Sequence, residues 1–160
     1  MGGPVRPHGL LRLLNRFPVW MFRLGLGWLF GNQLVMITHT GRKTGKPRCV
    51  VVEIVRYDRG TNTLLILSGW GERSDWFRNM AQTPEVVVQV GLRKWPAVAA
   101  RLSAQEAERE LLAYLRRRPV ALRVLARRFG IAGYPLGDQE QVCRLLAHQV
   151  PALACSPRKG

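Results

Sequence analysis

Hydrophobic residues along this chain follow two different periods, and the change between them divides the sequence. Between residues 34 and 102, short β-branched runs alternate with glycine- and proline-containing turns, a pattern typical of strands joined by hairpins. After residue 103, apolar residues recur every three or four positions, as in amphipathic helices. We predict strands over the following ranges: 34–39, 48–57, 63–69, 85–90, 94–102 and 150–157.

Start and stop signals mark the predicted helices. Ser103 and Glu106 form the S-x-x-E pattern of a capping box, and Pro119 ends the helix that follows. Gly130 ends a second helix, and Ser74 is the predicted N-cap of a short earlier one. We predict helices over 75–82, 104–118, 121–130 and 137–149.

The connections between the strands decide the fold class. The segment between 48–57 and 63–69 is too short for the crossover that parallel strands require. We therefore predict a mainly β, α+β protein with an antiparallel barrel and helices on its outside. The chain of 160 residues is long enough for one domain, 1–160. Its expected parts are an N-terminal amphipathic helical segment (1–33), core strands (34–102), helices (103–150) and a closing strand (150–157).

The N-terminal segment is rich in aromatic residues. Residues 17–31 are mostly apolar and include Arg23. A segment of only 15 residues is too short for a membrane span. One interpretation is a helix that packs its apolar side on the barrel or on a second subunit. The other is a basic, aromatic helix, within residues 10–31, that rests on an anionic membrane surface. The sequence leaves both open.

The charge of the chain is strongly one-sided. It has 25 basic and 10 acidic residues, a net charge of +15, and no acidic residue before Glu53. Such a surface favours anionic partners, namely nucleic acid, anionic lipid or a phosphorylated or polycarboxylate ligand. The three cysteines and three histidines are scattered and show no metal-binding spacing, so we predict no metal site and a cytoplasmic protein.

A basic turn precedes the second predicted strand. Gly41 and Gly45 permit a close approach of the backbone, and Thr44 adds a hydroxyl. Its successive backbone amides could form an anion-binding nest. The four basic residues of the turn are Arg42, Lys43, Lys46 and Arg48. From these residues alone, a phosphate site and a solvated turn are about equally supported.

A second stretch, SGWGERSDWFRNM (68–80), joins a strand to a helix. Backbone amides exposed at such a helix start suit an anion or a carbonyl-rich ring. Trp76 and Asn79 are three residues apart and share one helix face. Asn79 is the more informative of the two, because a buried amide needs hydrogen-bond partners.

These two stretches together resemble the deazaflavin-dependent nitroreductase family. The matching motifs are GRKTGKPR (41–48) and WFRNM (76–80), followed by a strand that starts after Thr83-Pro84. The resemblance implies a six-stranded antiparallel split β-barrel of the type found in FMN-binding, pyridoxamine-phosphate-oxidase-like proteins. It also implies the coenzyme F-420, an 8-hydroxy-5-deazaflavin with a phosphate and a polyglutamate tail, and hydride transfer to an electron-poor small molecule.

The resemblance also assigns site residues by motif matching. The phosphate and tail would be held by Arg42, Lys43, Thr44, Gly45, Lys46 and Arg48. The deazaflavin ring would lie between the strand residues Cys49, Val50, Val51 and Val52 and the turn residues Ser68, Gly69, Trp70 and Gly71, braced by Trp76 and Asn79. Ser68 is the one candidate catalytic residue, as a hydrogen-bond donor to the ring or the substrate.

The predicted function is thus that of a deazaflavin oxidoreductase, which we expect to act as a homodimer. Two alternatives to this function remain open. The same barrel could bind FMN or act as a non-catalytic coenzyme carrier. A nucleic-acid-binding module is suggested by the arginines between residues 116 and 128. It is disfavoured because the sequence shows no helix-turn-helix, zinc or RNA-recognition signature and the glycine-lined turn would have no obvious function there.

Overall fold

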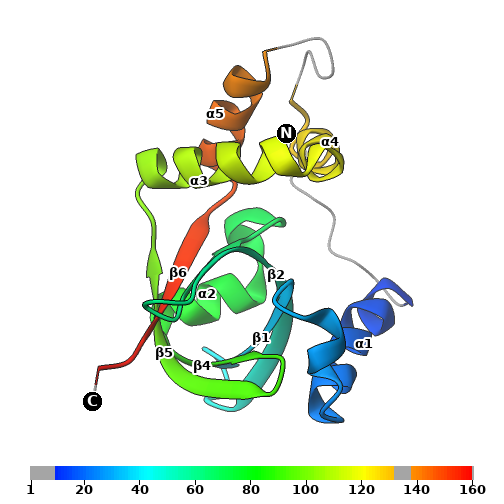
Figure 1. Ribbon diagram of the computed structural model, residues 1–160, viewed down its shortest axis with the longest axis vertical. Coiled ribbons are helices and arrows are strands. Elements are labelled where there is room, and N and C mark those ends of the chain that lie inside the picture. Colours follow the sequence, from blue (N-terminus) through cyan, green and yellow to red (C-terminus); the bar gives the residue numbers. More distant parts are fainter. Residues whose placement is uncertain (1–9, 132–137, 160) are drawn as a thin grey trace.

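The computed structural model describes residues 10–131 and 138–159, with side chains described from residue 16 onward. Within these ranges the chain forms one antiparallel barrel with helices packed outside it (Figure 1). The strands are β1 (Leu34–Thr40), β2 (Pro47–Asp58), β3 (Thr63–Leu67), β4 (Glu85–Val90), β5 (Arg93–Arg101) and β6 (Ala152–Pro157). They close in the order β1-β2-β3-β6-β5-β4, which confirms the predicted six-stranded antiparallel barrel.

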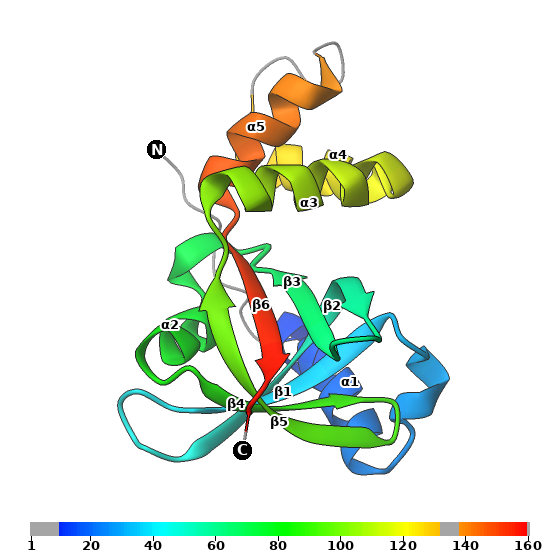
Figure 2. The ribbon, with the colours of Figure 1, turned by 60° about the vertical axis from the view of Figure 1, so that its left-hand side comes forward.

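Alternation along the strands builds the barrel core. Val35 and Ile37 of β1 and Val86, Val88 and Val90 of β4 are all buried, because every second side chain points inward. The last strand, β6, pairs with both β3 and β5, so a segment 85 to 91 residues beyond its partners in β3 closes the barrel. Figure 2 shows this closure, with β6 between β3 and β5.

A proline within a strand usually marks an edge or a bulge, and β5 contains Pro96. It lies in the middle of β5 and pairs with Val87 of β4. Pairing with β6 begins only at the next residue, Ala97. On that side the Pro96 carbonyl still accepts a hydrogen bond at 3.1 Å from the amide of Arg158, just beyond β6, so the chain is flanked on both sides at the proline.

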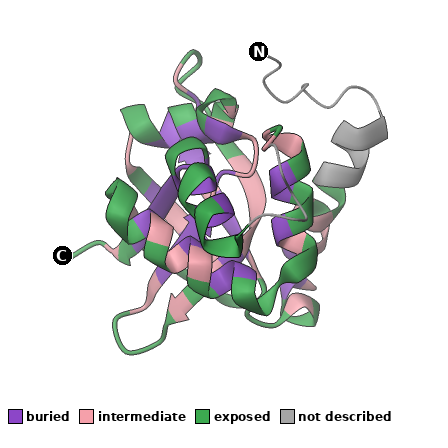
Figure 3. Ribbon diagram, turned by 90° about the horizontal axis from the view of Figure 1, so that it is seen from above, coloured by how far each residue is buried: buried purple, intermediate pink, exposed green. Residues whose placement is uncertain are grey.

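Three helices form a second layer at one end of the barrel: α3 (Ala104–Arg117), α4 (Pro119–Arg128) and α5 (Gln139–Gln149). The capping box of α3 is confirmed, since Ser103 and Glu106 exchange the two expected hydrogen bonds. The helices share a core around Leu111, Leu122 and Leu146, separate from that of the barrel. In Figure 3 helices are buried along one side and exposed along the other, as their sequence period predicts.

The N-terminal segment is helical but interrupted. α1 (Leu10–Arg23) ends before Gly25, which has a φ of 75°, and a 3₁₀ turn η1 (Gly27–Phe30) follows. Phe22 is buried and stacks on Phe30, so part of the segment packs inward on the domain. Several apolar side chains remain more than half exposed: Phe17, Trp20, Leu24, Trp28 and Leu29. Among the described helices, none is both long enough and apolar enough to span a membrane.

Candidate active site

The first half of β2 has a paired neighbour on one side only. Residues 47–53 pair with β1, whereas β3 joins β2 only from Ile54 onward. The Ile54 amide donates to the carbonyl of Gln33 at 2.8 Å, on the side of β1. Backbone groups alternate in direction along a strand, so those of Cys49 and Val51 point to the unpaired side. We call residues 47–53 the open edge of β2, and it can hydrogen-bond a planar polar ligand.

The basic turn is fixed to the helix α2 (Asp75–Gln82), which begins after the 3₁₀ turn η2 (Gly71–Arg73). The Arg42 guanidinium donates to a carboxylate oxygen of Asp75 at 2.9 Å and to the side-chain oxygen of Asn79 at 3.0 Å. The backbone amide of Arg42 donates to the same Asn79 oxygen at 3.1 Å. Arg42 therefore anchors the turn to α2, and its side chain is only 20% exposed.

Asn79 also joins the turn to a buried histidine. The Asn79 amide nitrogen lies 3.2 Å from Nδ1 of His39, and both side chains are buried. Burial, together with the positive charge of Arg48, lowers the pKa of His39 to about 4. The imidazole is thus neutral at pH 7, and its Nδ1 accepts the hydrogen bond. The expectation that a buried Asn79 needs partners is met by His39 and Arg42.

The backbone of the turn does not form the anion nest that its glycines suggested. The amides of Thr44 and Gly45 donate to the carbonyl of Gly41, at 3.2 and 2.7 Å. That of Lys46 donates to the Thr44 hydroxyl at 3.4 Å. Because internal partners occupy these amides, side-chain charge is what the turn offers an anion. A Cβ at Gly41 would lie 2.9 Å from the Thr44 hydroxyl oxygen and 3.3 Å from the Lys46 carbonyl oxygen, so a larger residue there would displace the turn's own contacts.

Three cations of the turn remain available to a ligand. Lys43, Lys46 and Arg48 are exposed, and within the part of the chain that the structure describes none of them forms a salt bridge. They stand directly beside the open edge of β2, because Arg48 is its second residue. A long anionic ligand could therefore contact the cations with its charged part and the strand edge with its polar ring.

Ser68 holds the strand-to-helix turn together. Its side chain is 1% exposed, and its hydroxyl donates to the carbonyl of Gly71 at 2.7 Å. It also lies 2.9 Å from the hydroxyl of Ser74. Ser74 is the N-cap residue of α2, as predicted, although its hydroxyl makes no capping bond to the helix backbone. The catalytic role of Ser68 stays a prediction, while the contacts seen give it a structural one.

Trp70 lies under an arginine of the helical layer. The Arg128 guanidinium is 3.9 Å from the centre of the Trp70 ring and donates to the carbonyl of Gly69 at 2.9 Å. Burial lowers the pKa of Arg128 from its usual value. Gly71 has a φ of 70°, the left-handed region that favours glycine. The turn 68–71 is thus fixed against α4, with Trp70 held by a cation–π contact.

Trp76, on α2, is half-buried and packs against the barrel core. It meets the buried Phe77 edge to face, with ring centres 6.2 Å apart. Val50 and Val52 of the open edge pack against the same core with their side chains. Val50 and Val52 therefore support the strand from inside, which leaves the backbone of the open edge for any ligand.

A comparison with known protein families identifies the family of this chain and its enzyme class. Residues 19–135, almost three quarters of the chain, match the model of the family described as F420H(2)-dependent quinone reductase. The chain belongs to this family. It is accordingly a deazaflavin-dependent oxidoreductase that uses coenzyme F-420, and the predicted resemblance is confirmed at the level of cofactor and enzyme class. The FMN and nucleic-acid alternatives are disfavoured by the same match.

Solved structures were compared with the architecture of this protein. An FMN-binding protein related to pyridoxamine 5'-phosphate oxidase, from Nostoc punctiforme, is 11% identical over 98% of this chain and 83% of its own, with a TM-score of 0.52. This likeness supports the split-barrel fold alone. An F420-H2 dependent reductase is 20% identical (77% and 93% covered, TM-score 0.46), and a domain-swapped dimer is 17% identical (92% and 99% covered, TM-score 0.49). Neither of these two adds an argument about fold or function.

Sequence reasoning missed three residues of this candidate site. His39 could have been found by alternation, since Val35 and Ile37 of the same strand point inward and the next inward position is 39. Asp75 and Arg128 carried no usable signal, because their partners lie 33 and 59 residues away in the sequence. Among the described residues, no group of three or more histidine, cysteine or acidic side chains could bind a metal.

Proposed function

We propose that this enzyme transfers a hydride from reduced coenzyme F-420 to a quinone, a planar, electron-poor acceptor. The observation that supports it most is the position of three unpaired cations beside the open edge of β2. A deazaflavin with a phosphate and a polyglutamate tail has the matching chemistry, a polar ring edge joined to a long polyanion. The acceptor class is proposed because the family is described as quinone reductases.

The residues present fit this coenzyme. Backbone groups of Cys49 and Val51 would hydrogen-bond the ring along the open edge, whose strand includes Val50 and Val52. Lys43, Lys46 and Arg48 would hold the phosphate and tail. Arg42 would act indirectly, by keeping the turn on α2, while Thr44 and Gly45 shape the turn itself.

The turn 68–71 would bound the site from its other side. Ser68 fixes this turn through Gly71, and Gly69 and Trp70 are held by Arg128. Trp76 and Asn79 would brace the same region from α2. The bound coenzyme supplies the hydride, and the protein supplies orientation and a positive field for its charged part.

A steady-state assay tests the acceptor class. Purified enzyme with reduced F-420 should reduce a short-chain naphthoquinone in proportion to enzyme concentration, followed by the appearance of the oxidised deazaflavin. A nitroaromatic compound and FMN-dependent turnover serve as comparisons. Quinone reduction no faster than the reaction without enzyme, in a preparation shown to bind F-420, would reject the quinone proposal without touching the cofactor.

Peripheral contact with an anionic membrane is a further part of this proposal. The exposed apolar side chains of α1 and η1 lie among exposed arginines, Arg16 and Arg23, and the chain carries a net charge of +15. Aromatic and basic residues on one amphipathic helix favour the interface of anionic lipid. A cytoplasmic enzyme attached in this way would meet lipid-dissolved quinones directly. Flotation of the protein with phosphatidylglycerol-containing vesicles tests the contact.

We also propose a homodimer. Val120 and Val124 of α4 and Leu145 of α5 are 68%, 46% and 45% exposed, respectively, and could be covered by a second copy. Light scattering coupled to gel filtration measures the mass directly. A single species of about 18 kDa across the concentration range would reject the dimer.

A further inference from the structure

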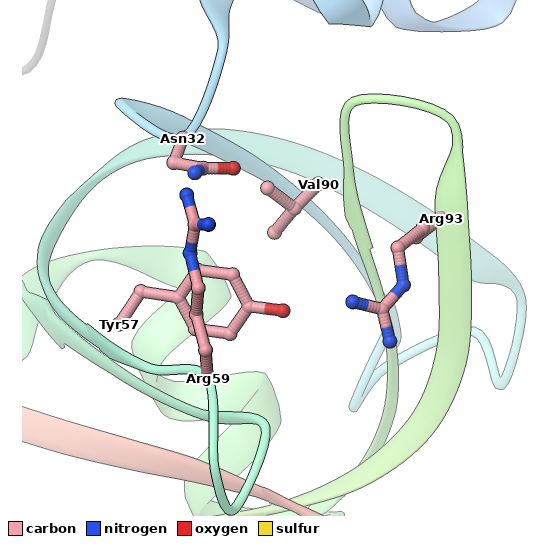
Figure 4. A pocket seen from close by; sticks show the side chains of 5 residues that line it. All are labelled: Asn32, Tyr57, Arg59, Val90 and Arg93. Carbon is pink, nitrogen blue, oxygen red and sulfur yellow. The ribbon is translucent and has the colours of Figure 1, made fainter.

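A small hollow lies at the end of the barrel opposite the basic turn. Its volume is about 220 Å³, and it opens between the connection from η1 to β1, the β2–β3 turn and the β4–β5 turn (Figure 4). β1 starts beside this hollow and ends at the basic turn, so the length of the strand separates the two. The side chains that line it are Asn32, Tyr57, Arg59, Val90 and Arg93.

The hollow is lined by cations without a matching acid. Arg59 and Arg93 are both exposed, and no carboxylate stands among the lining residues. The acid of the neighbouring turn, Asp58, accepts hydrogen bonds from the amides of Gly60 and Thr61, at 2.9 and 3.3 Å. Across the described residues, Arg59 takes part in no salt bridge. Two guanidinium groups facing one small space favour a phosphate.

Aromatic contacts hold the polar groups of the hollow in position. Tyr57 stacks on Trp95 with ring centres 6.3 Å apart, and Arg93 lies 5.6 Å above the same indole. The Tyr57 hydroxyl donates to the side-chain oxygen of Asn62 at 3.1 Å, and Arg93 donates to that oxygen at 3.4 Å. The hollow is therefore built before any ligand arrives, which lowers the entropic cost of binding one.

Exposed apolar side chains stand on the elements that border the hollow. Leu92, at the tip of the β4–β5 turn, is 70% exposed, and Trp28 and Leu29 of η1 are 56% and 53% exposed. The two elements touch, since a Cβ on Gly27 would lie 2.9 Å from the carbonyl oxygen of Gly91. A cationic hollow beside apolar and aromatic side chains matches one kind of molecule, an anionic phospholipid.

We propose that this hollow binds the phosphate of an anionic phospholipid headgroup, while Trp28, Leu29 and Leu92 enter the boundary of the acyl chains. The proposal rests on the membrane contact proposed above and adds to it a specific headgroup site. It places the membrane at the end of the barrel opposite the coenzyme cations, so the polyanionic tail and the lipid would not compete for the same arginines.

Flotation with vesicles tests the site. The probes are phosphatidylcholine vesicles with and without phosphatidylglycerol, and the variants are Arg59→Gln alone and together with Arg93→Gln. A matched control, Arg109→Gln with Arg123→Gln, removes the same charge from exposed positions on α3 and α4. We expect the double variant to lose about tenfold or more in partition onto anionic vesicles, with Arg59→Gln intermediate and the control within about threefold of wild type.

The outcomes separate this site from the general membrane contact. If wild type floats with anionic vesicles and the double variant does so equally, the headgroup site is rejected while the contact of α1 and η1 stands. An equal loss in the control would reject it too, because net charge alone would explain the binding. If wild type does not float at all, both proposals fail. If inorganic phosphate changes tryptophan fluorescence and vesicles have no effect, the hollow binds free phosphate and the lipid proposal is wrong.

Discussion

The two ends of the barrel use arginine in opposite ways. At the basic turn, Arg42 is paired with Asp75 and Asn79, so it fixes the backbone and leaves ligand contacts to its neighbours. At the other end, Arg59 and Arg93 face a hollow that contains no carboxylate. The comparison teaches that the partners of an arginine, more than its motif, decide whether it acts in structure or in binding. Figure 2 shows the two ends apart, with the turn on one side and η1 with the β4–β5 turn on the other.

The largest effect at the basic-turn end should follow loss of Asn79. Asn79→Ala removes two hydrogen bonds from Arg42 and one to His39, and it leaves buried polar groups unsatisfied. We expect the free energy of unfolding in urea to fall by about 3 kcal/mol. Gln82→Ala, at the exposed end of the same helix, should change it by less than about 0.5 kcal/mol. A loss below about 1 kcal/mol for Asn79→Ala would mean that the turn is held by other contacts.

His39 should make this end sensitive to acid. Its pKa is about 4 in the folded protein against 6.5 for a free histidine, so below pH 6.5 the unfolded chain binds a proton that the folded chain does not. Stability should therefore fall as the pH is lowered from 6.5 to 4, by about 2 kcal/mol more in wild type than in His39→Gln. Urea unfolding at several pH values measures the difference. Parallel curves for the two proteins would contradict the buried, neutral imidazole.

Loss of Arg128 should have an intermediate effect on the free energy of unfolding. This residue fixes the turn 68–71, which lies beside the proposed site. Arg128→Ala removes the cation–π contact with Trp70 and the hydrogen bond to Gly69. We expect a loss of about 1 to 2 kcal/mol in the free energy of unfolding and a shift in tryptophan emission. Arg127→Ala, the exposed neighbour, is the control, and an equal effect from it would show that the Trp70 contact is not special.

The smallest effect should come from a surface pair between the barrel and the helical layer. Arg56 and Glu110 lie 3.2 Å apart, and the Arg56 side chain is 57% exposed. Glu110→Gln should lower the free energy of unfolding by less than about 1 kcal/mol, and the loss should shrink at high salt. A larger loss that persists in salt would show that this pair fastens the helices to the barrel.

Local patterns predicted most of the fold. The six strands, the capping box of α3 and the short helix α2 followed from alternation, turn residues and helix start signals, which act within a few residues. The interruption of the N-terminal helix at Gly25 and the missing capping bond of the Ser74 hydroxyl did not follow. The second depends on a contact outside the helix, since the Ser74 hydroxyl lies 2.9 Å from that of Ser68 in the preceding turn.

The sequence predicted where the candidate site lies, but not which of its basic residues are paired within the protein. The motif pointed to the turn, α2 and the strand edge, and Arg42 and Asn79 do bring the first two together. It could not distinguish Arg42, which is occupied by Asp75, from Lys43 and Arg48, which are free of salt bridges in the described structure. That distinction depends on a contact across 33 residues, which no short pattern contains.

The central claim is that the unpaired cations of the basic turn hold the charged part of the deazaflavin coenzyme. Titration of the protein with F-420, followed by tryptophan quenching, tests it most directly in wild type and in Lys43→Ala combined with Arg48→Ala. Losing two charge-assisted contacts should weaken binding by roughly 10- to 100-fold and reduce its dependence on salt. The matched control is Arg109→Ala with Arg123→Ala, which should bind like wild type. Undiminished affinity for F-420 in the Lys43 and Arg48 double variant, or binding of FMN with no response to F-420 in wild type, would contradict the account.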